Sequence, residues 1–309
     1  MATEPVAPAT QNTQRTQGDI QGDTQREWKI VGVVGGGAMG SGIAYEVARN
    51  LDAQIIVREA DAHTLARARA NVERLIERPA QKGQITREVA DAWLARFTWT
   101  TTLADLAPAD IVIEAVYENL PLKQEIFAAL DSICAPDAIL ASNTSGLPVT
   151  QIASAAQRPE RALGLHFFNP VPAMKLVEII RAYQTSDETV ARSQAFCALL
   201  KKETILSKDY PGFITTRIGL MMIAEAIRCL EEGIGSIEDI DKGMKLGFNF
   251  PMGPFELADL VGLDVTLHIL EANREALGER FLPSPLLRNM VTAGYTGRKA
   301  GRGFYNYQK

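Results

Sequence analysis

The sequence has few of the residues that build metal centres and disulfide frameworks. It contains only three cysteines and three histidines in 309 residues. Cys134, Cys197 and Cys229 are far apart and lack the Cys-x-x-Cys spacing of metal and redox sites. Separated thiols in odd number fit a reducing compartment. We therefore expect no metal site, reduced cysteines and a cytoplasmic location.

Long apolar runs and basic clusters are also missing. No apolar run approaches the roughly 20 residues that a membrane span requires. The net charge is -5, so the basic surface on which non-specific nucleic-acid binding depends is not expected. With 46% hydrophobic and 22% charged residues, the composition is that of a globular protein. These absences predict a soluble protein that binds neither membranes nor nucleic acids.

The first 27 residues are poor in hydrophobic side chains. They are rich in Gln, Thr, Ala and Asp, and they lack the apolar segment of a secretory signal. So little apolar surface does not offset the entropy lost when a chain becomes ordered. We expect a disordered tail over residues 1–27 and assign it no function. The remaining length suits two domains of roughly 100 to 200 residues each.

Short apolar segments alternate with helical patterns between residues 28 and 208. We expect strands at residues 28–34, 53–57, 110–116, 138–141, 162–168 and 175–180, and helices at residues 41–49, 61–76, 86–96, 122–133 and 149–156. The helices at 61–76 and 86–96 would form a hairpin that projects from the sheet. This alternation is typical of an α/β fold, here a Rossmann-type doubly wound sheet.

After residue 208 the pattern becomes helical throughout. We expect helices at residues 218–232, 237–246, 254–270 and 285–293, separated by Gly or Pro. The sequence thus predicts a sheet domain over 28–208 and an all-α domain over 209–309. The helix at 218–232 is apolar over a broad surface, which indicates burial on several sides, including a subunit interface.

A glycine-rich turn follows the first expected strand. Gly35, Gly37 and Gly40 form the pattern Gly-x-Gly-x-x-Gly, with Ala38 and Met39 inside it, directly before a helix. Glycines at this spacing allow a tight turn and let a pyrophosphate approach the helix N-terminus. The pattern predicts a dinucleotide site; the alternative is a glycine-rich turn without a ligand.

An acidic residue at the end of the second strand strengthens that prediction. Glu59 lies 19 residues after Gly40, where a carboxylate can accept hydrogen bonds from the adenosine ribose. Its charge would repel a 2'-phosphate, so NAD is favoured over NADP. Two alternatives stay open. In the first, the neighbouring Arg58 binds a 2'-phosphate and the cofactor is NADP; in the second, Glu59 is an ordinary solvated acid with no role in binding.

Two ionisable residues lie on apolar strands. His166 is in the segment Gly-Leu-His-Phe-Phe-Asn-Pro, and Glu178 lies between Leu176 and Ile180 on one strand face. A carboxylate on such a face is costly unless it is paired, so we expect Glu178 to accept a hydrogen bond from His166. An oriented imidazole can remove the proton of an alcohol while a hydride passes to the nicotinamide. The alternative is a structural ion pair.

A polar turn follows the strand at residues 138–141. It contains the sequence Ser-Asn-Thr-Ser-Gly at residues 142–146, at a strand end where α/β sheets bind ligands. Its hydroxyl and amide groups could hold a substrate oxygen. The alternative is a simple helix cap.

These motifs together resemble the L-3-hydroxyacyl-CoA dehydrogenase family, in particular the bacterial 3-hydroxybutyryl-CoA dehydrogenases. The resemblance runs from about residue 28 to the C-terminus. It is carried by residues 35–43, 114–120 (Glu-Ala-Val-Tyr-Glu-Asn-Leu), 141–147, 166–178, 209–213, 250–257 (Phe-Pro-Met-Gly-Pro-Phe-Glu-Leu) and 297–305.

The resemblance implies an NAD-dependent, reversible oxidation of (S)-3-hydroxyacyl-CoA to 3-ketoacyl-CoA in fatty acid β-oxidation. It implies short acyl chains and a homodimer. Carried over by position, the general base is His166, the acid that orients it is Glu178, and the residue that binds the 3-oxygen is Ser145. Cofactor contacts fall on the glycine turn and on Glu59, Glu118, Lys123, Asn169 and Lys299.

Several of these assignments have simpler alternatives. Glu118 and Lys123 are also typical charges at a helix start, and Lys299 is also typical of a solvated segment. The hairpin after Glu59 resembles the region of the family that contacts coenzyme A. There Lys82 could meet a phosphate, or it could simply be solvated.

One position departs from the family pattern. The family has Pro-Gly-Phe, two further residues and then Asn-Arg, whereas Thr216 precedes Arg217 here. In the family this asparagine lines the active site near the substrate and the nicotinamide. A threonine donates one hydrogen bond but lacks the second amide group. Two other functions therefore stay open: a dehydrogenase of a free hydroxy acid, such as a gulonate dehydrogenase, and a non-catalytic NAD(H)-binding protein.

Overall fold

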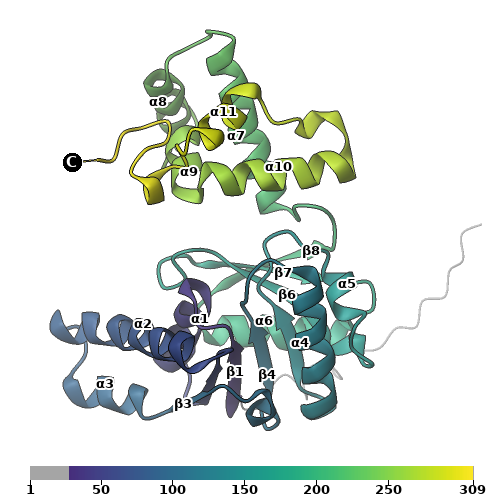
Figure 1. The fold of residues 1–309 in the computed structure, drawn as a ribbon. Coiled ribbons are helices and arrows are strands. Elements are labelled where there is room, and N and C mark those ends of the chain that lie inside the picture. The colour runs from purple at the N-terminus through teal and green to yellow at the C-terminus, as the bar shows by residue number, and fades with distance from the viewer. Residues whose placement is uncertain (1–27, 309) are drawn as a thin grey trace, which may run out of the picture.

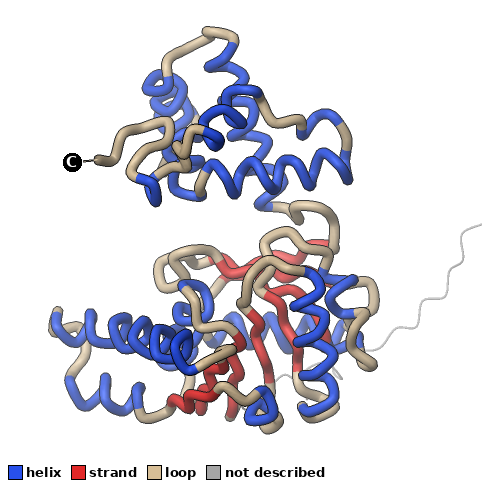
Figure 2. The backbone as a smooth tube through the Cα atoms, viewed as in Figure 1, coloured by secondary structure: helices blue, strands red, loops and turns tan. Residues whose placement is uncertain are grey.

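The computed structural model describes residues 28–308, so the tail predicted over 1–27 lies outside the described residues. A sheet domain and a helical domain follow one another along the chain and are joined through residues 209–214 (Figure 1). Figure 2 separates them by secondary structure: the strands all lie in the first domain. No helix of the described part is long and apolar enough to span a bilayer.

The sheet has eight strands in the order β3-β2-β1-β4-β5-β6-β7-β8. The strands are β1 Ile30–Val34, β2 Gln54–Arg58, β3 Phe97–Thr100, β4 Ile111–Glu114, β5 Ile139–Ser142, β6 Ala162–Phe167, β7 Leu176–Arg181 and β8 Glu203–Lys208. All neighbours are parallel except β6 and β7, which are antiparallel. The strand order reverses between β1 and β4, and ligands of such sheets bind at this point.

Helices cover both faces of the sheet. They are α1 Ala38–Asn50, α2 Ala62–Gln81, α3 Arg87–Leu94, α4 Leu120–Ile133, α5 Val149–Ala153 and α6 Asp187–Leu199. Helices α1, α2 and α6 share one apolar core with one face of the strands, and α4 and α5 share a second core with the other. The Rossmann-type prediction is confirmed. The pair of α2 and α3 projects from the sheet, as predicted (Figure 1).

The second domain is helical and has a core of its own. It contains α7 Thr215–Glu231, α8 Ile237–Gly247, α9 Pro254–Val261, α10 Leu263–Leu277 and α11 Pro285–Thr292. Buried carboxylates tie these helices to the C-terminal segment. Asp241 accepts hydrogen bonds from Phe255 N and Tyr305 Oη, and Asp259 accepts one from Tyr305 N.

The structure corrects one expected element and adds three that the sequence did not predict. The single helix expected at residues 254–270 is wrong, because Gly262 has a φ of 105° and separates α9 from α10. Strand β3, helix α6 and strand β8 were not predicted at all. Helix α6 buries polar Thr189 and Ser193 as well as Phe196, so no periodic apolar face marks it. Strands β3 and β8 lie at the two edges of the sheet, where burial is incomplete.

Candidate active site

The glycine turn between β1 and α1 has the geometry of a pyrophosphate cradle. Gly35 has a φ of 89°, in the left-handed region that favours glycine. A Cβ at Gly40 would overlap the carbonyl oxygen of Gly35, so only glycine fits there. Helix α1 begins at Ala38, followed by Met39, with no side-chain cap from Gly37. Its first N–H groups are therefore available to an anion, and these residues fit the pyrophosphate of NAD.

A cavity of about 330 Å³ continues from the glycine turn. Glu59, Arg58, Thr64 and Asn71 are among its lining residues. Glu59 Oε1 accepts a hydrogen bond of 2.6 Å from Gly36 N, so this carboxylate is fixed beside the turn and is not an ordinary solvated acid. The cavity has the position and the mostly apolar lining with a few polar groups that an adenosine moiety requires.

His166 and Glu178 face each other across strands β6 and β7. The antiparallel register makes them direct partners, with 3.2 Å between His166 Nδ1 and Glu178 Oε2. The predicted pair is therefore present. His166 is 5% exposed and Glu178 is fully buried. Because Nδ1 faces the carboxylate, the other ring nitrogen, Nε2, is left for a substrate proton.

The Glu178 carboxylate has partners from a third element. Its Oε1 accepts hydrogen bonds from Ile214 N at 2.8 Å and Thr215 N at 3.3 Å, and its Oε2 accepts one from Thr215 Oγ1 at 2.7 Å. Burial alone would raise the pKa of Glu178, but the hydrogen bonds from His166, Thr215 and Ile214 outweigh it and lower the pKa. Glu178 is therefore an anion at neutral pH, and it holds the imidazole in place.

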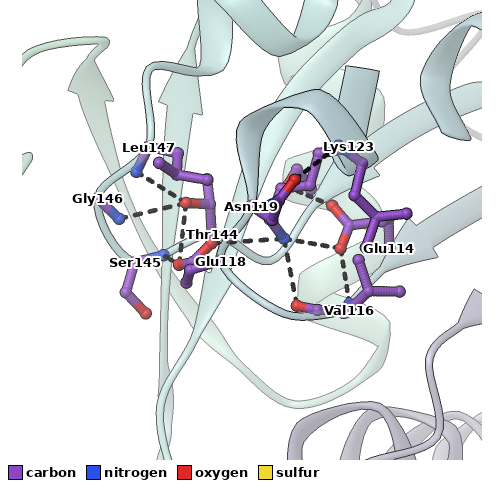
Figure 3. Close-up of polar contacts among 11 residues, drawn as sticks. Glu114, Val116, Glu118, Asn119, Lys123, Thr144, Ser145, Gly146 and Leu147 are labelled. Atoms are coloured by element: carbon purple, nitrogen blue, oxygen red, sulfur yellow. Dashed lines mark hydrogen bonds and ion pairs between the residues drawn. The ribbon is translucent and has the colours of Figure 1, made fainter. Parts of the chain in front are cut away.

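Ser145 lies in the turn that follows β5. Glu118 Oε1 accepts a hydrogen bond of 2.6 Å from Ser145 N and one of 3.1 Å from Thr144 Oγ1 (Figure 3). In the same view the Ser145 side chain points away from Thr144 and Glu118. The turn does not simply cap α5, because the first N–H groups of that helix bond to Asp209. Glu118 instead fixes the backbone that carries the serine hydroxyl.

Lys123 is fully buried between two carboxylates. Its Nζ lies 2.7 Å from Glu114 Oε1 and 3.5 Å from Glu118 Oε2 (Figure 3). Glu114 also accepts hydrogen bonds from Val116 N and Ser142 Oγ, each at 2.7 Å. Lys123 is therefore not an ordinary helix-start charge. Sequence reasoning missed Glu114, although a carboxylate ending the apolar strand β4 was the same signal that identified Glu178.

The remaining predicted residues lie on four different segments of the chain. Asn169 is exposed just after β6 and begins a cis peptide bond with Pro170. Thr216 is half-buried in the first turn of α7. Lys299 lies in the helical domain and forms an ion pair of 2.6 Å with Asp264. Lys82 is exposed at the C-terminal end of α2, in the turn of the hairpin.

Among residues 28–308, no three or more His, Cys, Asp or Glu side chains gather where they could hold a metal ion. Cys134 and Cys197 are buried and free. Burial raises their thiol pKa values, to about 11 for Cys134 and about 12 for Cys197. At neutral pH both thiols are therefore protonated and act as small apolar side chains.

Comparison with known proteins agrees with this geometry. The family model of the 3-hydroxyacyl-CoA dehydrogenase NAD binding domain matches residues 30–210, and the model of the C-terminal domain matches residues 212–307. A probable 3-hydroxybutyryl-CoA dehydrogenase of Bacillus subtilis is 47% identical over 287 residues, covering 92% of this chain and 99% of its own. The mitochondrial hydroxyacyl-coenzyme A dehydrogenase of Rattus norvegicus is 43% identical over 288 residues, covering 91% of each.

A solved structure has the same fold along its whole length. The (S)-3-hydroxybutyryl-CoA dehydrogenase of Ralstonia eutropha superposes with a TM-score of 0.87 at 42% identity, covering 92% of this chain and 100% of its own. The matched models span both domains, and the cradle, the cavity and the His166–Glu178 pair lie within them. The chain belongs to the 3-hydroxyacyl-CoA dehydrogenase family and is an NAD-dependent oxidoreductase.

Proposed function

We propose that the protein oxidises short-chain (S)-3-hydroxyacyl-CoA, with 3-hydroxybutyryl-CoA as its main substrate, and that it works in the cytoplasm. The observation that carries the chemistry is the buried His166–Glu178 pair, whose free ring nitrogen can take a hydroxyl proton. The preference for four carbons is supported by the names of the bacterial relatives at 42 to 47% identity.

In this reaction His166 Nε2 accepts the proton of the 3-hydroxyl group while the C–H bond at C3 breaks. NAD held by the glycine turn would supply the hydride acceptor, so that oxidation would give a 3-ketoacyl-CoA, NADH and one proton on the imidazole. Glu178 stabilises the imidazolium that forms, because its carboxylate lies against Nδ1. Reduction runs the same steps backwards, with the imidazolium as the acid.

Ser145 is proposed to donate a hydrogen bond from its hydroxyl group to the 3-oxygen of the substrate. Glu118 supports this role, because its Oε1 accepts a hydrogen bond of 2.6 Å from Ser145 N and so fixes the backbone of the serine. We propose the glycine turn and Glu59 as the main cofactor contacts, and Glu118, Lys123, Asn169 and Lys299 as further ones. Lys82 is proposed to meet a coenzyme A phosphate, since it is an exposed cation at the end of the projecting hairpin.

Thr216 stands where the family that the sequence resembles has an asparagine. It is proposed to face the substrate from the first turn of α7, where it offers one hydroxyl in place of an asparagine amide. The Thr216→Asn variant would restore the second polar group. We expect its KM for acetoacetyl-CoA to fall and its Kd for NADH to stay unchanged.

The experiment that tests the proposed function measures NADH oxidation with 3-ketoacyl-CoA substrates of increasing chain length. We expect the highest kcat/KM with acetoacetyl-CoA, and a marked preference for NADH over NADPH because of Glu59. Turnover of free sugar acids instead would support the gulonate-type function. NADH binding without turnover of any acyl-CoA would support the non-catalytic function.

We also propose that two copies associate through the helical domain. Several large apolar side chains of this domain are exposed, among them Ile218 at 66%, Leu246 at 76% and Phe248 at 70%. Apolar surface of this kind is typical of an interface between subunits. Light scattering after size-exclusion chromatography should give the mass of a dimer, and Ile218→Glu should shift it toward the monomer.

A further inference from the structure

We propose that Thr215 is a positioning residue of the catalytic base. Its hydroxyl group binds the Glu178 carboxylate and so reduces how strongly Glu178 stabilises the protonated form of His166. The inference rests on the proposed role of His166 as the base. It concerns a residue that sequence reasoning did not single out, at the start of the second domain. It also gives the junction between the two domains a part in the chemistry.

The geometry places two donors on the same carboxylate oxygen. Glu178 Oε2 lies 2.7 Å from Thr215 Oγ1 and 3.2 Å from His166 Nδ1. The hydrogen bond from the Thr215 hydroxyl is therefore shorter than the one from the imidazole. Thr215 also donates its backbone N–H to Oε1, so this residue alone supplies two of the contacts that orient the carboxylate. The first residue of helix α7 therefore binds Glu178, the carboxylate that orients His166.

A hydrogen bond to a carboxylate oxygen competes with the other partners of that oxygen. Each donor withdraws part of the negative charge and lowers the proton affinity of the carboxylate. With the Thr215 hydroxyl present, Glu178 stabilises a protonated His166 less strongly than it otherwise would. Removing the hydroxyl should therefore make Glu178 stabilise the imidazolium of His166 more strongly.

No other charged group among the described residues contacts Glu178 and could change how strongly it stabilises protonated His166. Among the described residues, the ionisable group in contact with Glu178 is His166 itself. On the other side of β7, strand β8 places Ile205 next to Glu178. The first charged residue of α7, Arg217, lies over the ring of Tyr210 at 5.4 Å.

The test compares the pH profiles of the Thr215→Val and Thr215→Ser variants with that of the wild-type protein. Valine removes the hydroxyl but keeps the shape and the backbone N–H, whereas serine keeps the hydroxyl. We measure kcat/KM for 3-hydroxybutyryl-CoA with NAD and for acetoacetyl-CoA with NADH between pH 5 and 10. For Thr215→Val we expect the acid limb of oxidation and the alkaline limb of reduction to move together, upward by roughly 0.5 to 1 pH unit.

Thr215→Ser should keep both limbs at their wild-type positions. The inference is overturned if Thr215→Val leaves the limbs in place or moves them downward, even where kcat falls, since a purely structural role would lower activity without moving them. It is also overturned if Thr215→Ser behaves like Thr215→Val, because the methyl group would then be what matters. The His166→Gln variant separates this from the proposed function: if it remains active, the role of His166 as the base fails first.

Discussion

Two fully buried carboxylates in the same sheet are used differently. Glu114 ends β4 and pairs with Lys123 at 2.7 Å, nine residues later in the same βα unit. Glu178 lies within β7, and its partners come from the neighbouring strand β6 and from the first turn of the helical domain. Both pairs are close in the sequence, but Glu178 also binds the start of α7, which is 36 and 37 residues away.

The partners also differ in chemistry. Lys123 Nζ contacts both Glu114 and Glu118, and Glu118 accepts a hydrogen bond from Ser145 N, so the pair of Glu114 and Lys123 supports the turn that carries Ser145. Imidazole is the side chain that gains and loses a proton near neutral pH. In the proposed reaction His166 therefore exchanges a proton with the substrate while Glu178 orients it, whereas Glu114 and Lys123 serve as a support. The following changes should separate these two roles.

The largest effect is expected from the His166→Gln variant. It removes the base but keeps a side chain of similar size, so kcat should fall by about 10³-fold, within the range of general-base catalysis. The Kd for NADH, measured by its fluorescence, should stay within about twofold of wild type, because the cofactor cradle lies on β1 and α1. Substantial remaining turnover would contradict the proposed role of His166.

The Lys123→Met variant should lower the free energy of unfolding more than any other change at the pair of Glu114 and Lys123. It leaves the buried Glu114 carboxylate without its cation, and breaking a buried pair in this way costs about 3 to 5 kcal/mol of unfolding free energy. Denaturant unfolding measures it. Lys82→Met is the matched control, because Lys82 is exposed. Equal stability of the two variants would show that the support is not needed for folding.

A smaller effect is expected from a change at Glu118, which connects Lys123 to the turn that carries Ser145. Glu118→Ala removes the acceptor for Ser145 N and should lower kcat/KM for acetoacetyl-CoA roughly tenfold, since the serine loses its fixed position. Glu125→Ala, at an exposed position of α4, is the control and should behave as wild type. If both variants have wild-type kinetics, Glu118 does not position the serine.

The smallest effect concerns stability in acid. The pKa of Glu178 in the folded protein is lowered, so its contribution to stability is complete above the unfolded carboxyl pKa of about 4.3 and is lost as pH falls through the folded value. Between pH 6 and pH 3 the wild-type protein should lose unfolding free energy more steeply than Glu178→Gln. Parallel pH curves would show that Glu178 has no such linkage.

Much of the site follows from local patterns in the chain. The glycine turn and Glu59 were predicted because they are neighbours along one βαβ unit, where spacing in the sequence sets position in space. The pair of His166 and Glu178 was predicted because a carboxylate on a buried strand face requires a partner. Strand β8 and helix α6 could not be predicted in this way, since their burial follows no regular period. Strand β3 does alternate aromatic and threonine side chains, but it is only four residues long.

By itself, the sequence determined the fold class, the cofactor and the pairing of His166 with Glu178, because periodicity, the glycine turn and buried charge are properties of single segments. Only the tertiary structure decided what Glu178 binds besides His166. Its contacts with Ile214 and Thr215 join residues 36 and 37 positions apart, through a packing of β7 against the start of α7. Such contacts depend on how two domains meet, and no local pattern in the sequence specifies that.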